Sequence, residues 1–445
     1  MTELPKDFLK RMEQLLKEEY TDFIASFERP AARGIRLNPL KCGEETLQKA
    51  MPFPLIPSIF SKYCYELPTN AEKPGSFPLH HAGAFYSQEP SASSAVTILD
   101  PQPGEKILDL CAAPGGKSTQ IAGLLSGQGL LWSNEVVRTR ASILLSNIER
   151  LGVQNAVVSS FYPEVLCEKL QGFFDRVLVD APCSGEGMFR RDPQAVRDWS
   201  VEHVETCAVR QRLILDSACL AVKENGVLVY STCTFSQEEN EGVVRSFLKK
   251  HPDFILEDAN VSFGRPGIAM PETRRIFPMD GGDGHFVARL RRLSANPGSI
   301  PLYSAVKTPV CSEGEALYNE LFCAPATQIM VQNKDQLLLL PKEVPQLSGL
   351  GVIRAGVLFG ELKKGRIEPA HAVWMAAKPH ELRQVLLLSS GSADIASFLH
   401  GEELEVAPSF KGYTGVAVDG VMTGFGKCSA GRLKNRYPKG LRIHL

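Results

Sequence analysis

The stretch that decides the fold is LDLCAAPGGKSTQ, residues 108–120. It begins at the end of an apolar run typical of a buried β-strand, passes through a glycine-rich turn and continues into a helical pattern. Many nucleotide-dependent enzymes hold a triphosphate in such a strand–turn–helix unit. Their loop has a glycine five residues before the position of Gly116, where this chain has Cys111. The stretch therefore predicts a ligand-binding turn and disfavours a P-loop NTPase.

Beyond this turn, strand-like and helix-like patterns alternate as in a doubly wound parallel sheet. The predicted strands are 105–110, 129–134, 155–159, 174–180 and 226–232. The predicted helices are 117–126, 138–151, 203–222 and 237–250. A late strand-like segment, 284–292, is expected to add antiparallel at the edge of the sheet. The predicted fold class is therefore α/β, with a Rossmann-like core.

The segments on either side of this core have different patterns. Apolar periodicity predicts a helix from Phe8 to Phe27, a basic strand-like piece covers 33–38, and 84–99 is expected to form a helix leading into the core. Residues 294–312 contain the Pro, Gly and Ser typical of a linker. The predicted units are an N-terminal domain at 1–75, the core at 76–293, the linker at 294–312, and C-terminal subdomains at 313–380 and 381–445.

Composition and cysteine spacing limit the classes of function. The net charge is −1, so a nucleic-acid partner has to be argued from a local patch. The 11 cysteines include no C-x-x-C pair, which disfavours a disulfide framework and a thiolate zinc site. The His203-Val204-Glu205 match to a zinc deaminase lacks the cysteine pair such a site requires, so no metal is expected. With no signal peptide and no apolar run near about 18 residues, we expect a cytoplasmic protein without a membrane segment.

The ligand at the turn is predicted from its glycines and from one acid. Gly115 and Gly116 let the backbone approach a ligand closely. Glu135 ends the second predicted strand, 20 residues after Gly115, at the spacing of acids that bind ribose hydroxyls. Because the turn lacks the G-x-G-x-x-G pattern of pyrophosphate sites, S-adenosylmethionine is the favoured cofactor. A solvated strand end remains open for Glu135, as does a surface position for Lys117.

Two cysteines follow two predicted strands. Cys183 comes after the fourth strand in the sequence Asp-Ala-Pro-Cys, and Cys233 comes after the fifth in Ser-Thr-Cys. Because the carboxyl ends of neighbouring parallel strands meet at one edge of a sheet, both cysteines are expected beside the cofactor turn. A thiolate there can act as a covalent nucleophile. A pair of small buried hydrophobic residues is the alternative interpretation.

At these motifs the chain resembles the Nol–Nop–Sun family of RNA cytosine-5 methyltransferases, and within it the RsmF type that acts on small-subunit ribosomal RNA. The matching stretches are GAFYSQEPSA (83–92), ILDLCAAPGGKSTQIA (107–122), SNE (133–135), VLVDAPCSGEGMFRRDP (177–193) and LVYSTCTFSQEENEGVV (228–244). The stretch GKCSAGRLKNRYPKGLR (426–442) is similar to the PUA-like ending of the RsmF type. The resemblance implies an RRM-like N-terminal domain, a methyltransferase core and a PUA-like C-terminal region.

The resemblance also implies roles for individual residues. It places the cofactor loop on Cys111, Ala112, Ala113, Pro114, Gly115, Gly116 and Lys117. It implies that Glu135 binds the ribose, that Cys233 adds to carbon 6 of cytosine, and that Cys183 takes part in release. Asp180 is implied at both the cofactor and the catalytic site, where sharing a proton with ring nitrogen 3 would require a raised pKa. The family's usual adenine-contacting Asp is missing, because this chain has Ser160, Phe161 and Tyr162 there.

An RNA partner is expected to contact basic residues outside the glycine-rich turn. The segment 420–445 holds six basic residues and no acid, with Phe425 and Tyr437 among them, and predicts a phosphate-binding surface. The other predicted RNA contacts are Arg33, Arg36, Arg190 and Arg191. The predicted function is cytosine-5 methylation of ribosomal RNA by a monomeric enzyme, with the assembling small subunit as the expected partner. A tRNA cytosine-5 methyltransferase and a non-catalytic RNA-binding assembly factor remain open as alternatives.

Overall fold

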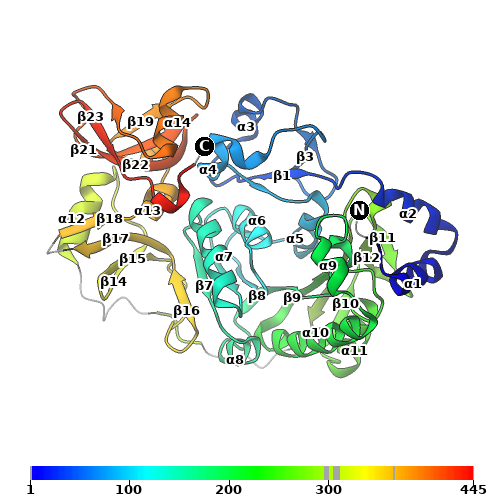
Figure 1. The fold of residues 1–445 in the computed structure, drawn as a ribbon. Helices are drawn as coiled ribbons and strands as arrows, with labels where there is room; N and C mark the ends of the chain where they lie inside the picture. The colour runs from blue at the N-terminus through cyan, green and yellow to red at the C-terminus, as the bar shows by residue number, and fades with distance from the viewer. Residues whose placement is uncertain (1–2, 295–299, 304–310, 364–365, 444–445) are drawn as a thin grey trace.

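The computed structural model describes residues 3–294, 300–303, 311–363 and 366–443. Strands in these residues form four sheets, and the largest of them lies at the centre of the molecule (Figure 1). The C-terminus lies beside two N-terminal helices, α3 (Glu44–Ala50) and α4 (Pro78–His81) (Figure 1). The C-terminal part of the described chain and the region of α3 and α4 therefore lie side by side and share a hydrophobic cluster (Figure 1). Within the described residues, no helix has the length and apolar character needed to cross a membrane.

Ten strands form the central sheet. In spatial order they are β11 (Arg265–Gly267), β12 (Met270–Ile276), β13 (His285–Arg292), β9 (Val222–Thr232), β8 (Phe174–Asp180), β5 (Lys106–Asp109), β6 (Leu130–Asn134), β7 (Ala156–Ser159) and β16 (Val352–Ala355), with β10 (Phe254–Glu257) paired to β13. The strands from β9 to β7 in this order are parallel. The predicted Rossmann-like core is confirmed. The order reverses between β5 and β8, where open parallel sheets bind ligands.

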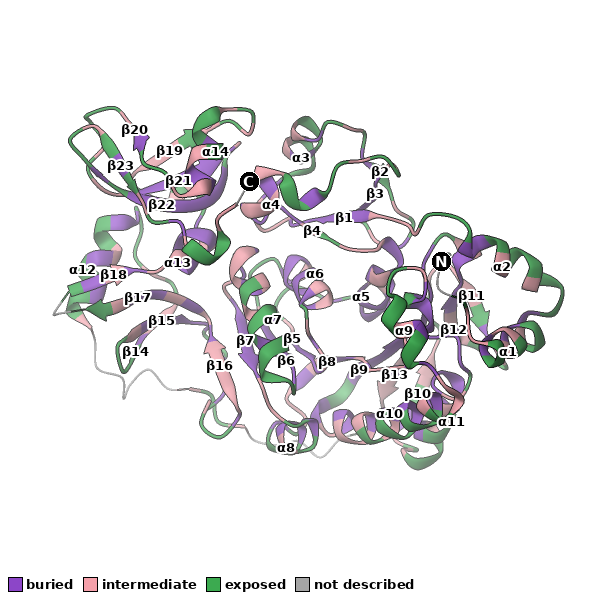
Figure 2. Cartoon of the chain, in the orientation of Figure 1, coloured by how far each residue is buried: buried purple, intermediate pink, exposed green. Residues whose placement is uncertain are grey.

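Helices cover both faces of the central sheet (Figure 2). On one face lie α5 (Ser94–Leu99), α6 (Gly116–Leu125) and α7 (Arg138–Arg150). On the other lie α8 (Pro163–Lys169), α10 (Val201–Ala221) and α11 (Glu241–Lys250). Ile107 packs in the first cluster and its neighbour Leu108 in the second, because successive strand residues point to opposite faces. Burial on both faces explains why the strands are continuous apolar runs.

The segment 84–99, predicted as one helix, is a strand followed by a helix. Phe85–Ser87 forms β4, which pairs with β1 (Gly34–Leu37). Helical structure starts only after Glu89, whose side chain accepts hydrogen bonds from the backbone N–H groups of Ser91 and Ala92. Proline follows this cap directly and has no N–H to donate, so it suits a first helical position and not an interior one. The cap at Glu89 and the proline after it therefore start the helix later than the apolar periodicity predicted.

Two strands of the central sheet lie where the sequence pattern does not place them. The late segment forms β13, but it is interior to the sheet, between β9 and β12, and not at the edge. The edge strand next to β7 is β16, which comes from beyond the predicted linker and pairs antiparallel. An edge position is set by which other segments fold onto the sheet, so local periodicity cannot assign it.

The N-terminal region packs against two different neighbours. The predicted helix 8–27 is two helices, α1 (Lys6–Leu16) and α2 (Tyr20–Phe27), because Lys17 has a φ of 51°, outside the helical range. Both helices pack on the Rossmann-like core, where Phe23 meets Phe235 with ring centroids 5.4 Å apart. The N-terminal sheet consists of β2 (Ile56–Pro57), β3 (Cys64–Glu66), β1 and β4. Its fourth strand lies beyond the boundary expected at residue 75.

Two further sheets form the C-terminal part. The first contains β14 (Ile329–Asn333), β15 (Gln336–Leu340), β17 (Val357–Lys363) and β18 (Arg366–Pro369), with helices α12 (Ser312–Leu321) and α13 (His371–Ala376). The second contains β19 (Val385–Leu388), β21 (Gly412–Val418), β22 (Val421–Ser429), β23 (Arg432–Asn435) and β20 (Leu404–Glu405), with helix α14 (Ala393–His400). The second sheet shares a hydrophobic cluster with the N-terminal sheet. Most of the predicted linker, 295–299 and 304–310, lies outside the described residues.

The basic C-terminal segment is folded into the second of these sheets. Its two aromatic residues are buried and do not lie on a basic surface, which corrects the sequence-based expectation. Phe425 stacks on Trp374 with ring centroids 5.0 Å apart, and Tyr437 packs on Phe398 at 5.6 Å. The basic side chains that remain exposed are those of Lys427, Arg432, Lys434, Arg436 and Lys439. Phe425 and Lys427 are two residues apart on β22 and so point to the same face of that strand, which means that Phe425 is buried because Trp374 covers it and not because of strand alternation.

Candidate active site and cofactor cavity

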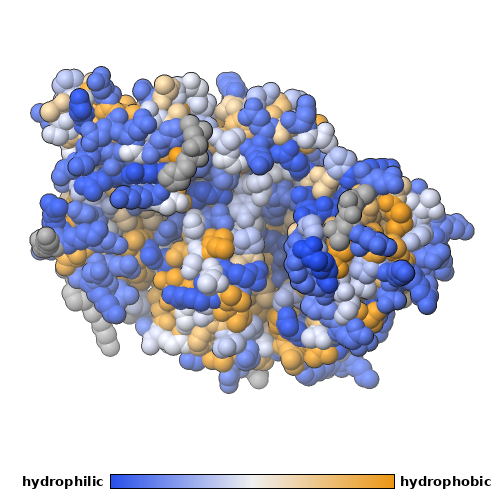
Figure 3. All heavy atoms as spheres, viewed as in Figure 1, coloured by the Kyte–Doolittle hydropathy of each residue, from blue (hydrophilic) through white to orange (hydrophobic). Residues whose placement is uncertain are grey.

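A cavity of about 1050 Å³ opens at the carboxyl edge of the central sheet. Figure 3 shows a hollow between the α7–α8 side and the α9–α10 side of the molecule, where α9 is Pro193–Asp198. The lining includes the predicted site residues Cys111, Ala113, Glu135, Asp180, Cys183 and Cys233. The fold therefore brings the ends of four strands, β5, β6, β8 and β9, to one cavity.

The glycine-rich turn begins the cavity wall and leads into α6. Gly115 has a φ of 113°, a conformation that favours glycine, and a Cβ there would lie 3.2 Å from the side chain of Leu144. Asp109, which the sequence reading missed, is buried at the end of β5 and accepts a hydrogen bond of 2.7 Å from Ser118 Oγ. Burial raises the pKa of Asp109 to about 7. This contact fixes the first turn of α6 against β5 and so sets the shape of the turn.

Glu135 lies on the opposite wall, directly after β6. Its Oε1 accepts a hydrogen bond of 3.0 Å from the backbone N–H of Val137, and its Oε2 lies 3.2 Å from Arg140. The carboxylate is buried against the protein and borders the cavity, unlike a solvated strand end. Arg140 also donates to the carbonyl of Ala113 at 3.1 Å, which ties the acid to the glycine-rich turn.

The region expected to contact an adenine ring has apolar walls. Tyr162 and Val136 both line the cavity and are exposed to 62% and 40%. The backbone N–H of Phe161 is already bonded to Asn134 Oδ1 at 3.1 Å, so it is not available to a ligand. The side chain in the place of the missing acid is therefore an aromatic ring that can stack on a base.

Lys117 and Asp180 form an ion pair beneath the cavity. The Nζ of Lys117 lies 2.7 Å from Asp180 Oδ2, and the hydroxyl of Ser231 donates to Asp180 Oδ1, also at 2.7 Å. Burial lowers the pKa of Lys117, but the contacts with Asp180 together with Cys233 and Asp109 raise it, and the net shift is upward. The ammonium of Lys117 is therefore held directly against Asp180, and the proton-sharing role expected of Asp180 stays a prediction.

The two cysteine sulfurs are in direct contact. The Sγ atoms of Cys183 and Cys233 lie 3.2 Å apart, and the backbone N–H of Cys233 points to the Cys183 sulfur at 3.4 Å. The hydrogen bond with Cys233, together with burial, raises the pKa of Cys183 well above its usual range. Cys183 is therefore a thiol at neutral pH and can donate its S–H to the sulfur of Cys233.

Two buried glutamates behind the cysteines were also missed by the sequence reading. Glu239 lies against Ser184, and Glu186 lies against Thr234, the residues that directly follow the two cysteines. The backbone N–H of Gly187 also donates to the carbonyl of Cys233 at 2.9 Å. These contacts fix the relative position of the two cysteine loops. Glutamates within VLVDAPCSGEGMFRRDP and LVYSTCTFSQEENEGVV were visible in the sequence, but nothing local shows that they are buried.

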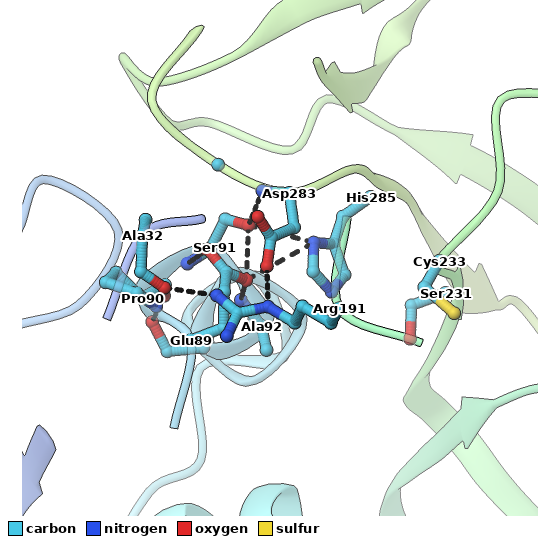
Figure 4. Close-up of polar contacts among 12 residues, drawn as sticks. Ala32, Glu89, Pro90, Ser91, Ala92, Arg191, Ser231, Cys233, Asp283 and His285 are labelled. Atoms are coloured by element: carbon cyan, nitrogen blue, oxygen red, sulfur yellow. Dashed lines mark hydrogen bonds and ion pairs between the residues drawn. The ribbon is translucent and has the colours of Figure 1, made fainter. Parts of the chain in front are cut away.

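A polar cluster joins the N-terminal region to the catalytic sheet. Figure 4 shows Arg191 between the Ala32 carbonyl and Asp283, with Ser91 and His285 beside them. The Nδ1 of His285 lies 2.9 Å from Ser91 Oγ, and burial lowers the pKa of His285 to about 3, so its ring is neutral. Figure 4 shows His285 on the side of this cluster nearer to Ser231 and Cys233.

The four arginines predicted to contact RNA instead make contacts within the protein. Arg36 is buried and donates to Gly116 O and to Thr119 Oγ1, both at 2.7 Å. Arg33 donates to Ala71 O at 2.8 Å. The remaining two, Arg190 and Arg191, are paired with Asp283. A buried guanidinium with a full set of partners is not available to a phosphate, so the prediction is wrong for Arg36.

Known families match nearly the whole length of the chain. The model for 16S rRNA methyltransferase RsmB/F matches residues 96–291, and that for the N-terminal domain of 16S rRNA methyltransferase RsmF matches 4–90. The first C-terminal domain of RsmF matches 317–376, and the RsmF PUA domain matches 386–443. Ribosomal RNA small subunit methyltransferase F of Vibrio vulnificus is 32% identical over 98% of this chain and 97% of its own length. The chain belongs to the RsmF family.

A second relative has the same family name, and two solved structures share the fold. The protein of the same name from Aeromonas salmonicida is 33% identical over 99% of this chain and 97% of its own. A methyltransferase homolog protein from Pyrococcus horikoshii is 29% identical, with a TM-score of 0.58, covering 65% of this chain and 95% of that one. NSun6 from the same organism, solved with SFG, is 23% identical and has a TM-score of 0.57. The match covers 65% of this chain and 98% of the NSun6 chain, and at this identity it shows the fold alone. As in its family, the cofactor is S-adenosylmethionine.

Proposed function

We propose that this RsmF-family enzyme methylates carbon 5 of a cytosine in small-subunit ribosomal RNA through a covalent adduct on Cys233. The observation that carries the proposal is the contact of two cysteine sulfurs, 3.2 Å apart, at the wall of the cofactor cavity. Carbon 5 of cytosine is a weak nucleophile, and a thiolate added to carbon 6 makes it electron-rich. A site for methylating nitrogen or oxygen has no need of such a pair.

The residues of the cavity fit S-adenosylmethionine. The carboxylate of Glu135 is positioned to accept hydrogen bonds from ribose hydroxyls. Tyr162 and Val136 offer apolar surface to the adenine. The turn from Cys111 to Lys117 leads into the first turn of α6, which has free backbone N–H groups. Cys111 suits this wall, because burial raises the pKa of its thiol and keeps it neutral. When bound, the cofactor supplies a methyl group on a sulfonium sulfur, so a carbon–methyl bond forms as the sulfur–methyl bond breaks.

The chain's own residues start the reaction at carbon 6. The Cys233 thiolate forms the Sγ–C6 bond, and the electrons of the C5=C6 double bond move toward carbon 5 and the ring. The S–H of Cys183 donates to the Cys233 sulfur and stabilises its thiolate before the attack. Lys117, acting through the carboxylate of Asp180, delivers a proton to ring nitrogen 3 and neutralises the charge that builds there.

The release step uses the second cysteine. The largest cause of the raised pKa of Cys183 is its hydrogen bond with Cys233, and this bond is lost once Cys233 is a thioether. Cys183 then gives its proton to water and, as a thiolate, removes the proton from methylated carbon 5. The C5=C6 double bond forms again, the Sγ–C6 bond breaks and Cys233 leaves as a thiolate. The nitrogen-3 proton returns to the Lys117–Asp180 pair.

The exposed face of the last sheet supports RNA binding. Lys427 lies directly opposite Lys434 on neighbouring strands and opposite Tyr413 on the other side. Like charges facing each other destabilise a sheet unless an anion binds between them. The Nζ of Lys427 lies 5.2 Å from the Tyr413 ring, a residue that the sequence reading did not single out. We propose this surface, Tyr413, Lys427 and Lys434, as the phosphate contact of a PUA-like domain, with a monomeric enzyme acting on the assembling small subunit.

The substrate is tested by offering the purified protein different RNAs. We expect S-adenosylmethionine-dependent formation of 5-methylcytidine in small-subunit rRNA, either free or in small subunits from cells lacking the gene. Methylation of tRNA alone would favour the tRNA alternative. Binding of RNA without any methylation would favour the non-catalytic assembly factor, and methyl groups on another base or atom would contradict the cytosine chemistry.

Glu135→Ala is expected to weaken S-adenosylmethionine binding by about 1–3 kcal/mol, because a buried carboxylate that accepts ribose hydroxyls is lost. Isothermal titration calorimetry measures this directly. Glu168→Ala, which removes an exposed carboxylate on α8, is the matched control and should bind normally. Equal affinity of the two variants for S-adenosylmethionine would mean that Glu135 interacts only with Arg140 and not with the cofactor.

Replacing both Lys427 and Lys434 by glutamine is expected to flatten the salt dependence of RNA binding. Each single-strand phosphate contact contributes about 0.7 to the slope of log affinity against log salt, so two contacts give about 1.4. The control replaces Arg245 and Lys249, two exposed basic residues of α11, by glutamine. The same slope in both double variants would exclude the last sheet as a phosphate contact.

A further inference from the structure

Two fully buried glutamates lie directly behind the cysteine pair, and the proposed reaction gives them no part. Glu239 and Glu186 are each 0% exposed. They are joined through the hydroxyls of Ser184 and Thr234, the residues that follow the two cysteines. We call Glu239, Ser184, Thr234 and Glu186 the carboxyl–hydroxyl chain. Its protonation can be counted from its contacts.

The carboxyl–hydroxyl chain has three oxygen–oxygen contacts, and each needs one proton. Ser184 Oγ is hydrogen-bonded with Glu239 Oε1, Ser184 Oγ lies 2.9 Å from Thr234 Oγ1, and Thr234 Oγ1 lies 2.8 Å from Glu186 Oε2. The two hydroxyls supply two protons, because a serine or threonine has one donor each. With both carboxyls ionised, one pair of buried oxygens would face each other without a proton. A third proton must therefore reside on one of the glutamates.

Glu186 is not the acid that holds the third proton. Its Oε1 accepts hydrogen bonds from the indole N–H of Trp199 at 2.9 Å and from the hydroxyl of Ser236 at 2.7 Å. Its Oε2 accepts from the backbone N–H of Phe235 at 2.7 Å in addition to Thr234. Each oxygen receives one N–H group that cannot act as an acceptor, from Trp199 on Oε1 and from Phe235 on Oε2, so a proton on either oxygen would compete with that N–H group. Glu186 is a carboxylate.

Glu239 has an oxygen free to hold the proton. Its Oε2 accepts both nitrogen donors, the backbone N–H of Ser184 at 3.0 Å and the amide of Gln211 at 2.7 Å. Its Oε1 meets only Ser184 Oγ. Burial raises the pKa of Glu239 to about 7, with the hydrogen bonds from Ser184 and Gln211 acting to lower it and the neighbouring charge of Glu186 acting to raise it. Burial, charge and the count of donors agree on the same residue.

We infer that Glu239 is held as a neutral carboxylic acid and is the positioning residue that keeps the two cysteine sulfurs in contact. Its proton completes a one-directional series in which Glu239 donates to Ser184, Ser184 to Thr234, and Thr234 to ionised Glu186. A neutral Glu239 also avoids placing a second buried negative charge behind the Cys233 thiolate. The protonation is independent of the reaction, whereas its catalytic consequence rests on the proposed function.

Infrared spectroscopy of the full-length protein tests the protonation without any substrate. With glutamate labelled by ¹³C at the side-chain carboxyl, the difference spectrum between wild type and Glu239→Gln at neutral pH should contain the carbonyl band of a carboxylic acid. That band should shift slightly in D₂O, as an exchangeable proton requires. A carboxylate band in its place would overturn the inference.

The positioning role is tested by the rate at which the adduct with substrate RNA forms. Glu239→Ala should lower this rate by about a hundredfold, because the sulfurs lose their alignment. Glu239→Gln should restore it to within about tenfold of wild type, because its amide N–H donates to Ser184 as the acid does and its carbonyl accepts the two N–H donors. Glu186→Gln should stay as impaired as Glu186→Ala, because an amide N–H₂ in place of either oxygen would face two donors.

The pattern of rescue separates a protonated acid from a general structural role. Affinity for S-adenosylmethionine and the thermal unfolding midpoint identify variants that fail to fold, and only folded variants are compared. If glutamine restored the rate at Glu186 and not at Glu239, the proton would have to be assigned to Glu186, and the inference would be overturned. Equal loss in both glutamine variants would overturn the positioning role. No adduct in the wild type would contradict the proposed function and leave the infrared result intact.

Discussion

We expect the Cys183→Ala variant to remain covalently bound to its RNA. Cys233 still adds to carbon 6 and carbon 5 still accepts the methyl group, but the base that removes the carbon-5 proton is missing, so the Sγ–C6 bond cannot break. A protein–RNA adduct that survives denaturing gel electrophoresis should therefore accumulate in the presence of S-adenosylmethionine. The expectation depends on the 3.2 Å contact between the sulfurs, which leaves Cys183 beside the reacting carbons.

The same assay assigns the roles of the two cysteines. Cys233→Ala should form no adduct and no product while cofactor affinity stays within a few-fold, and the double variant should form no adduct because no nucleophile remains. Cys323→Ala, which removes an exposed thiol that does not line the cavity, is the control and should turn over normally. An adduct in the Cys233 variant and none in the Cys183 variant would exchange the roles. Normal product formation by Cys183→Ala would show that the Cys183 thiol contributes only to packing and not to the reaction.

Asp180→Asn is expected to lower kcat by about 10²–10⁴, the range for loss of a general acid–base group. An amide cannot pass a proton from Lys117 to the ring, and it leaves the buried ammonium without its partner at 2.7 Å. Single-turnover methylation at saturating RNA and cofactor measures the effect. Ser231→Ala, which removes one hydrogen bond to Asp180, should have a smaller effect in the same direction.

The two roles predicted for Asp180 give different kinetic signatures. A catalytic role lowers kcat and leaves the dissociation constant of S-adenosylmethionine within a few-fold. A cofactor-binding role raises that dissociation constant and leaves single-turnover rates at saturation nearly unchanged. Asp198→Asn, a change at an exposed carboxylate of α9, is the control for the loss of one charge.

The sequence by itself determined the core of the fold and the identity of the paired motifs. Strands such as β5 and β6 are short apolar runs and helices such as α7 are amphipathic, and these patterns are local. The meeting of Cys183 and Cys233 followed from a general property of parallel sheets, since β8 and β9 end at the same edge. Their positions were predictable because they required no knowledge of side-chain packing.

The tertiary structure decided which segments pack together at long range. The strand β16 completes the catalytic sheet from beyond the linker, and the N-terminal sheet shares its hydrophobic cluster with β21 to β23. Long-range packing also buries three residues that were expected at an RNA surface: Arg36 against α6, Phe425 against α13 and Tyr437 against α14. A basic or aromatic residue has the same local pattern on a surface as in an interface, so only the folded neighbours distinguish the two.

The tertiary structure also decided the chemistry behind the cysteines. Glu186 and Glu239 stand in polar stretches whose pattern resembles a solvated loop, yet both are fully buried and bonded to the residues that follow the cysteines. Whether a carboxyl group is ionised depends on its burial and on how many donors surround it. Those donors come from segments far apart in the chain, so the protonation of Glu239 is a property of the folded site and not of its sequence motif.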